Sequence, residues 1–349
     1  MCGDTTDTLR SLPAGSVDVV ATSPPYWGRR RYVPGDDREL GIQPLHEYLS
    51  LMGDVFDEVA RVLAPGGLVW VNIGDAASHS GGSGGDYNAG GSYAGRARYK
   101  PPAATVWVPE PGALGGVTLT KLPAGQWADV PGRLAHELQA RGWLLRSNIV
   151  WAKPNPKREA IGHVRRPKEA HERILLLSRD KPGDTRFDSD DERLGDVWEL
   201  DVARGDEAVG WAPWPVALPA KMLSLSGSPG VCLDPFAGRG NTLLAAAAAG
   251  WSCVGIDFDA DAVDEVTARV PGVEHLTAQD AGPALPARSL VGGRRILWAP
   301  GSARRRTVRC LLGRSSLVWR AAFPFPPGRG RWTAHVGSER PAAHRAPGE

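Results

Sequence analysis

The segment from Val231 to Asp259 constrains the fold of this chain more than any other. It opens with a short apolar run that predicts a buried strand, turns through a glycine-containing loop, and continues into the helix formers of residues 243–249. A second apolar run, residues 253–256, predicts another strand that ends at Asp257. This order is typical of a β-α-β unit with a glycine-rich first turn.

The turn between the first strand and the helix predicts a site for a nucleoside cofactor. Gly238 and Gly240 allow a ligand to approach the backbone, and the start of the next helix offers N–H groups without partners inside the helix. Asp257 ends the second strand, where a carboxylate can accept hydrogen bonds from both hydroxyls of a ribose. The alternative is an ordinary α/β turn with two spacer glycines.

Two features of the turn indicate which nucleoside it binds. The third glycine of the dinucleotide-binding pattern is missing, because Leu243 occupies its position. Asp234 at the start of the turn is unsuited to a pyrophosphate but suits a cationic ligand. S-adenosylmethionine carries a sulfonium and an ammonium group, so the turn favours this cofactor, and a nicotinamide oxidoreductase is a distant alternative.

A second unusual segment lies near the N-terminus. Residues 16–21 alternate as a strand would, and they lead directly into the sequence TSPPYW of residues 22–27. Two consecutive prolines force an extended, rigid backbone. An aromatic pair then follows at the carboxyl edge of the sheet, where α/β enzymes bind ligands. The alternative is a simple strand stop with a capping aromatic residue.

Composition excludes several classes of protein. No apolar run reaches the roughly 18 residues that a membrane span requires, and the N-terminus lacks the basic and apolar regions of a signal peptide. The four cysteines show no paired spacing, and no metal site is predicted. We therefore expect a cytoplasmic protein that has no contact with a membrane.

Charge divides the chain into two parts. Residues 283–349 hold 13 Arg, no Lys and two Glu, a net charge of +11, whereas residues 1–282 hold 28 basic and 37 acidic residues, a net charge of −9. We predict a domain over 1–282, with a glycine-rich loop or insertion at 76–125 that is a candidate target-recognition element. Residues 283–349 are predicted to be a disordered Arg- and Pro-rich tail. It is either a nucleic-acid-binding arm or a non-native C-terminus that arose from a frame change.

The spacing of apolar residues predicts the remaining elements of the domain. Helices are predicted at residues 5–12, 45–63, 130–144 and 215–225, and strands at 68–73, 145–151 and 174–177.

At two motifs the chain resembles the amino-group DNA methyltransferases, which modify N4 of cytosine or N6 of adenine. Residues 234–242, DPFAGRGNT, are similar to the cofactor motif DPFAGSGTT of that family, and residues 22–27 to its catalytic motif TSPPYW. Arg239 and Asn241 stand where Ser and Thr are usual. The catalytic motif comes first, which resembles the circularly permuted β group. The resemblance implies a Rossmann-like α/β fold with a seven-stranded, mostly parallel sheet, helices on both faces and one reversed strand.

The resemblance also implies an activity. The chain is expected to transfer a methyl group from S-adenosylmethionine to the N4 amine of a flipped cytosine at a specific site in double-stranded DNA. The implied catalytic residues are Ser23, Pro24, Pro25 and Tyr26. The Ser23 side chain and the Pro24 carbonyl would accept hydrogen bonds from the amine, and Tyr26 would stack on the base. No cysteine follows a proline, which argues against methylation of carbon 5.

The implied cofactor-binding residues come from three places in the chain. Asp4 would lie beside the adenine amine and Asp257 on the ribose. The methionine portion would be enclosed by Asp234, Pro235, Phe236, Gly238, Gly240, Asn241 and Thr242.

Two alternatives stay open from the sequence, namely an N6-adenine methyltransferase and a catalytically inactive DNA-binding relative. Adenine-modifying relatives more often carry Asp or Asn where this chain has Ser23. A cognate restriction endonuclease is a candidate partner. Arg29, Arg30 and Arg31, with the loop residues Arg96, Arg98 and Lys100, are expected to contact phosphates near the flipped base.

Overall fold

The structure of the chain is a computed structural model that describes residues 5–29, 39–78, 105–109, 117–154, 167, 169–203, 214–257, 266, 269–270, 273–275 and 296–300. Contacts divide the chain into two compact units, Met1–Arg309 and Cys310–Glu349, and the described residues all belong to the first. None of the helices in this described part is long and apolar enough to cross a membrane.

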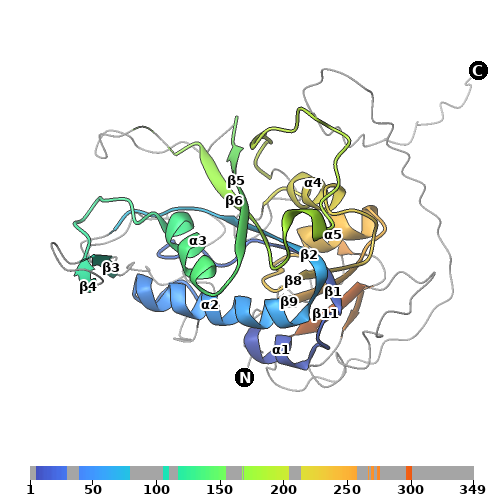
Figure 1. Cartoon of the computed structure of the whole chain (residues 1–349), viewed down its shortest axis with the longest axis horizontal. Coiled ribbons are helices and arrows are strands. Elements are labelled where there is room, and N and C mark those ends of the chain that lie inside the picture. The colour runs from blue at the N-terminus through green and yellow to red at the C-terminus, as the bar shows by residue number, and fades with distance from the viewer. Residues whose placement is uncertain are drawn as a thin grey trace, which may run out of the picture. The chain divides into compact units, whose positions relative to one another are not determined.

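The first unit is organised around a nine-stranded sheet, in the order β10-β11-β9-β8-β1-β2-β6-β5-β7 (Figure 1). In chain order the strands are β1 (Val17–Thr22), β2 (Leu63–Ile73), β5 (Leu144–Ala152), β6 (His171–Ser178), β7 (Val197–Glu199), β8 (Val231–Asp234), β9 (Ser252–Asp257), β10 (Val273–His275) and β11 (Ile296–Pro300). All neighbouring strands are parallel except where β6 meets β2 and β5. The strand β6 is therefore the reversed strand.

Helices cover both faces of the sheet, and each face has its own apolar core. One face carries α1 (Thr5–Ser11), α2 (Leu45–Val62) and α3 (Val130–Ala140), and the other carries α4 (Ala217–Ser224) and α5 (Asn241–Ala248) (Figure 1). The helix α2 shows why: its buried residues Met52, Phe56 and Val59 recur at intervals of three and four and form one stripe. Each such side chain contributes roughly 1.5–3 kcal/mol when buried.

The predicted fold class is confirmed. The sheet is mostly parallel, has one reversed strand and carries helices on both faces. The strand β8 comes late in the chain yet pairs with β1, which is the arrangement that a circular permutation produces. The short edge strand β7 and the strand β11, which lies between β10 and β9, are additional to the seven expected strands.

The structure differs from the sequence prediction in the insertion and in the tail. Residues 105–109 (β3, Thr105–Pro109) and 117–121 (β4, Val117–Lys121) form an antiparallel pair inside the predicted loop. The strand β11 lies inside the predicted tail, and the first compact unit extends to Arg309 rather than to residue 282. The strands β3, β4 and β11 are short apolar or β-branched runs within stretches rich in Gly, Arg or Pro, and the overall composition of those stretches hides them.

Two element boundaries also differ. The strand β2 begins at Leu63, five residues earlier than predicted, because Leu63 pairs with Val17 before an irregularity in the β1–β2 register. The helix α3 ends at Ala140 rather than 144, and Gly142 follows with a φ of 84°.

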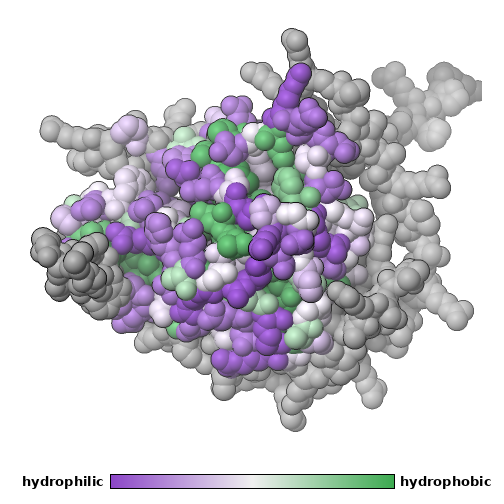
Figure 2. All heavy atoms as spheres, viewed as in Figure 1, coloured by the Kyte–Doolittle hydropathy of each residue, from purple (hydrophilic) through white to green (hydrophobic). Residues whose placement is uncertain are grey.

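The face in Figure 2 is largely hydrophilic, with small hydrophobic patches between the polar side chains. Among the described residues, the exposed large hydrophobic side chains are Leu51, Leu144, Phe187 and Val197.

Candidate active site

The strand that leads into the predicted catalytic motif and the strand that leads into the predicted cofactor motif are neighbours in the sheet. The strands β1 and β8 run parallel, with Val19 opposite Cys232, so both motifs leave the sheet at the same edge. Thr22, the last residue of β1, donates a hydrogen bond of 2.6 Å from its Oγ1 to Oδ1 of Asp234, the last residue of β8. Side chains thus join the two motifs directly.

Asp234 is the centre of a buried hydrogen-bonded cluster. Its carboxylate accepts hydrogen bonds from the hydroxyls of Thr22 and Thr242 and from the backbone N–H of Phe236. Burial raises the pKa of Asp234 to about 6, a rise that the three hydrogen bonds oppose and the nearby charge of Asp257 increases. The carboxylate is therefore mostly ionised at neutral pH but at a cost, which a cationic ligand nearby would reduce.

The glycine turn after Asp234 is open on one side. Gly238 and Gly240 have φ angles of 50° and 80°, in the left-handed region that favours glycine. A Cβ on Gly240 would lie 3.0 Å from Val266 Cγ2, whereas a Cβ on Gly238 would meet no atom within 4 Å. The N–H of Gly238 donates a hydrogen bond of 2.6 Å to Asp257 Oδ2. The open turn with a carboxylate at its edge fits a cofactor that carries ribose hydroxyls and positive charge.

Two of the predicted cofactor-binding side chains bind other parts of the protein. Asn241 Nδ2 donates to the carbonyl of Trp214 at 2.7 Å, and Asn241 Oδ1 accepts from Arg269 Nη2 at 3.0 Å. The Thr242 hydroxyl donates to Asp234, and both residues are buried. These side chains shape the turn, so a contact with a ligand would come from their backbone.

Pro235 begins the turn and is tied to the N-terminal helix. The Thr5 hydroxyl, at the start of α1, donates a hydrogen bond of 3.2 Å to the Pro235 carbonyl. Phe236 is half-buried and packs against the core on the α1–α3 face. Asp4 directly precedes Thr5 but lies outside the described residues.

The predicted catalytic segment is anchored to α2 and to the loop before it. Trp27 is fully buried, and its Nε1 donates to the Gln43 carbonyl at 2.9 Å. The Tyr48 hydroxyl, on α2, donates to the Pro25 carbonyl at 2.9 Å. Trp27 is thus an anchor inside the core. By contrast, none of the described residues donates a hydrogen bond to the Pro24 carbonyl.

The ring of Tyr26 lies close to Gly74, the residue that follows β2. A Cβ on Gly74 would be 2.7 Å from Cε2 of the Tyr26 ring, so this close approach requires glycine. Ser23 and Tyr26 are both half-buried, and their hydroxyl oxygens are 3.3 Å apart.

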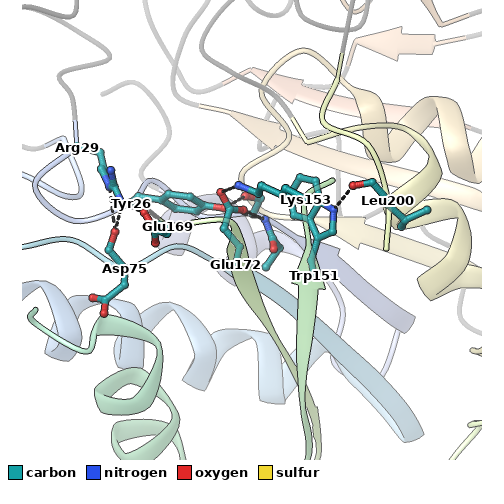
Figure 3. Close-up of polar contacts among 10 residues, drawn as sticks. Tyr26, Arg29, Asp75, Trp151, Lys153, Glu169, Glu172 and Leu200 are labelled. Atoms are coloured by element: carbon teal, nitrogen blue, oxygen red, sulfur yellow. Dashed lines mark hydrogen bonds and ion pairs between the residues drawn. The ribbon is translucent and has the colours of Figure 1, made fainter. Parts of the chain in front are cut away.

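The hydroxyl of Tyr26 belongs to a polar network that the sequence analysis did not assign (Figure 3). Tyr26 donates to Glu172 Oε2 at 2.7 Å, and Asn72 Nδ2 donates both to the Tyr26 hydroxyl at 2.7 Å and to Glu172 Oε2 at 2.9 Å. Lys153 Nζ bonds to Glu172 Oε1. Burial alone raises the pKa of Glu172, but the charge of Lys153 and the hydrogen bonds outweigh it, so the pKa lies below its usual value and the carboxylate is ionised.

Asn72 leaves one buried polar atom unpaired. Its side chain is fully buried, and within the described part of the chain its Oδ1 has no hydrogen-bond partner. A flipped amide would bring Oδ1 against the Glu172 carboxylate, two acceptors facing each other. A sequence signal for this residue existed: an asparagine inside the apolar run LVWVNI.

Arg29, predicted to contact phosphates, pairs with protein groups. Its Nε donates to the Asp75 carbonyl at 2.9 Å, and its Nη2 is 2.7 Å from Glu169 Oε2. Burial raises the pKa of both Asp75 and Glu169. These carboxylates, with Asp129 and Glu172, line a pocket of about 140 Å³.

No cluster of three or more His, Cys, Asp or Glu that could hold a metal is found among the described residues. The other predicted phosphate contacts, namely Arg30, Arg31, Arg96, Arg98 and Lys100, lie outside the described residues.

Comparison with known proteins gives matches over most of the chain. A family described as "DNA methylase" matches residues 17–268. Among curated proteins, the chain is 31% identical to the type II methyltransferase M.Cfr9I of Citrobacter freundii, over 77% of this chain and 86% of that protein. It is 32% identical to the type II methyltransferase M.SmaI of Serratia marcescens, over 74% and 85% respectively.

A solved structure shares the fold. The PvuII DNA methyltransferase, which is described as cytosine-N4-specific, superposes with a TM-score of 0.55 at 18% identity, over 77% of this chain and 84% of that one.

Proposed function

The chain belongs to the DNA methylase family of amino-group methyltransferases, which use S-adenosylmethionine, and from this premise we propose that it methylates the N4 amine of cytosine in double-stranded DNA. The observation that carries the proposal is the hydrogen bond between Thr22 and Asp234. It supports a site in which a base held after β1 lies beside a cofactor held after β8.

The chemistry requires acceptors at the amine. The lone pair of an exocyclic amine is delocalised into the ring, so the nitrogen is a poor nucleophile. Ser23 Oγ and the Pro24 carbonyl each accept a hydrogen bond from one N–H group of the amine. These hydrogen bonds draw the nitrogen lone pair out of conjugation with the ring. S-adenosylmethionine supplies an electrophilic methyl group when bound. Orientation then provides most of the rate, because the methyl group would pass directly from sulfur to nitrogen without a covalent enzyme intermediate, and the nitrogen would lose one N–H proton to water.

The other groups of the site have positioning and binding roles in this proposal. Tyr26 stacks on the base after it leaves the duplex. Asp257 binds the ribose hydroxyls, and Asp234 provides negative charge near the sulfonium and ammonium groups. The anchored backbone at Pro25 keeps the Pro24 carbonyl in place.

Cytosine is favoured over adenine by the hexamer TSPPYW as a whole. A serine hydroxyl can accept a hydrogen bond from the amine of either base, so this contact alone does not separate them. Adenine-modifying relatives more often have Asp or Asn at the position of Ser23. The residue type at position 23 therefore favours N4 of cytosine.

The proposal is tested by methylating unmodified genomic DNA with the purified full chain and S-adenosylmethionine, and analysing the nucleosides by mass spectrometry. We expect N4-methylcytosine, and we expect it to disappear with Ser23→Ala. N6-methyladenine as the product would overturn the choice of cytosine. If no methylated nucleoside forms, the proposal fails and an inactive DNA-binding relative is the better description.

We extend the proposal to a partner, because the two curated relatives above are named type II methyltransferases. A restriction endonuclease that cuts the same DNA sequence is the expected partner. DNA modified by the chain should then resist that endonuclease and stay sensitive to endonucleases of unrelated specificity.

A further inference from the structure

The proton of the Tyr26 hydroxyl has one destination. Glu172 is ionised, and an ionised carboxylate accepts hydrogen bonds but donates none. The bond of 2.7 Å between Tyr26 and Glu172 Oε2 must therefore use the Tyr26 proton. Lys153 lies at Oε1 of the same carboxylate (Figure 3), and its positive charge favours the ionised form of Glu172.

The direction of the next hydrogen bond follows from the first. A hydroxyl has a single proton, so the Tyr26 oxygen can only accept from its other neighbours. Asn72 Nδ2 donates to it at 2.7 Å, and Ser23 Oγ lies 3.3 Å from it. Ser23 must be the donor in that contact. The lone pairs of its oxygen are then left as acceptors.

Asn72 reinforces this direction. Its amide keeps the N–H groups toward Glu172 and Tyr26, although this leaves its own buried Oδ1 unpaired in the described structure. A buried acceptor without a hydrogen-bond partner destabilises the fold. The protein thus keeps a donor at this place at the expense of a hydrogen bond elsewhere.

We propose that Glu172 is a positioning residue that sets the polarity of the chain Ser23–Tyr26–Glu172, so that the Ser23 oxygen faces the target amine as an acceptor. The inference rests on the proposed function, in which Ser23 accepts from an exocyclic amine. Glu172 itself does not contact the base. Its effect is to prevent Ser23 from turning its proton toward the amine, an arrangement in which two donors would meet.

Two substitutions separate polarity from shape. Glu172→Gln keeps the size of the side chain but introduces an N–H₂ group. Lys153 retains the carbonyl oxygen, so the N–H₂ group faces Tyr26 and reverses the chain of hydrogen bonds. Glu172→Asp is shorter but remains an acceptor only. Polarity control predicts that the Asp variant is the more active one, whereas a purely structural role predicts that the isosteric Gln variant is.

For Glu172→Gln we expect a ten- to hundredfold lower kcat, with KM for S-adenosylmethionine and Kd for DNA close to the parent. Asp18→Asn is the matched control. Asp18 is also half-buried, pairs with Arg186 at 2.9 Å and accepts from the Val231 N–H, but it lies at the opposite end of β1. We expect this control to lose stability and to retain kcat.

A double-mutant cycle with Tyr26→Phe tests whether Glu172 acts through the hydroxyl. Phenylalanine keeps the ring but removes the hydroxyl that links Ser23 to Glu172. The double variant with Tyr26→Phe and Glu172→Gln should therefore have a kcat no lower than that of Tyr26→Phe alone. If the kcat losses of the two single variants multiply in the double variant, or if Glu172→Gln is as fast as the parent, the inference is overturned while the proposed function stays in place. A parent chain that forms no methylated nucleoside would instead contradict the proposed function.

Discussion

At the scale of single residues, three carboxylates hold the site together by accepting hydrogen bonds from other elements. Asp234 joins β8 to Thr22 of β1, Asp257 joins β9 to the turn at Gly238, and Glu172 joins β6 to Tyr26. The fold brings these carboxylates from distant parts of the chain to one edge of the sheet. A change in any of them therefore affects two segments at once.

The raised pKa of Asp234 makes stability depend on pH. The pKa of this carboxyl group is 3.8 in the unfolded chain and about 6 in the folded protein. Between these values the native state binds more protons, so its contribution to stability falls as pH rises through this window and is constant above it. The rise in the pKa of Asp234 corresponds to a loss of roughly 3 kcal/mol in the free energy of unfolding. Urea unfolding should show Asp234→Asn gaining up to ~3 kcal/mol relative to the parent between pH 4 and pH 7. A difference that is the same at both pH values would contradict the raised pKa.

Asp257→Ala should weaken binding of S-adenosylmethionine about ten- to hundredfold, because a hydrogen bond to a charged group contributes roughly 1.5–3 kcal/mol. The Gly238 N–H also loses its acceptor in this variant. Asp257→Asn keeps an oxygen for Gly238 and removes only the charge, so we expect an intermediate affinity. Calorimetric titration measures both. Unchanged affinity in a folded Ala variant would remove Asp257 from the cofactor site.

At the scale of elements, periodicity in the sequence predicted most helices and strands of the domain. The helix over 45–63 and the β-α-β unit after Val231 are found within a residue or two, because their apolar spacing and their stop signals agree. The motifs also predicted Ser23 and Asp257 as site residues, and Ser23 directly follows β1 while Asp257 ends β9. The polar network around Glu172 was not assigned, because contacts between residues 100 or more positions apart leave no local pattern.

The contact between α2 and the catalytic segment can be tested by removing one oxygen. Tyr48→Phe leaves the Pro25 carbonyl without its donor and should cost about 1 kcal/mol of stability. It should lower kcat more than cofactor affinity, since Pro25 follows Pro24, whose carbonyl we propose accepts from the amine. Ser224→Ala, which removes a hydroxyl–carbonyl hydrogen bond on α4, is the control and should keep kcat. Equal kcat in both variants would show that α2 does not hold this segment.

At the scale of the whole molecule, charge and folding do not divide at the same residue. The excess of arginine begins after residue 282, but the compact unit ends at Arg309 and includes β11. Composition could not predict this, because the five residues of β11 stand between two arginine clusters. The arginines on either side of β11 dominate the average charge and composition of the segment, so the apolar run does not stand out.

The charge of residues 310–349 predicts an effect on DNA binding. They hold six Arg and two Glu, so a chain that ends at Arg309 has a net charge of +2 − 4 = −2. Each phosphate contact that is lost reduces the slope of log affinity against log salt by about 0.9. We expect the shortened chain to bind non-specific DNA more weakly at low salt and with a shallower slope. Identical slopes would show that these residues make no phosphate contact.

A shorter chain that ends at residue 282 tests the role of β11 in the cofactor site. In the sheet β11 lies beside β9, and Pro300 is opposite Asp257, the residue expected to bind the ribose. Removing β11 takes away the main-chain hydrogen bonds that pair it with β9 and exposes an edge of β9. Asp257 then loses part of the backbone pairing that holds it in place. The chain ending at 309 should melt cooperatively and bind S-adenosylmethionine like the full chain, while the chain ending at 282 should melt at a lower temperature and bind it more weakly. Equal melting temperatures and equal affinities in the two shortened chains would show that β11 contributes nothing to the site, and that the boundary read from charge is the functional one.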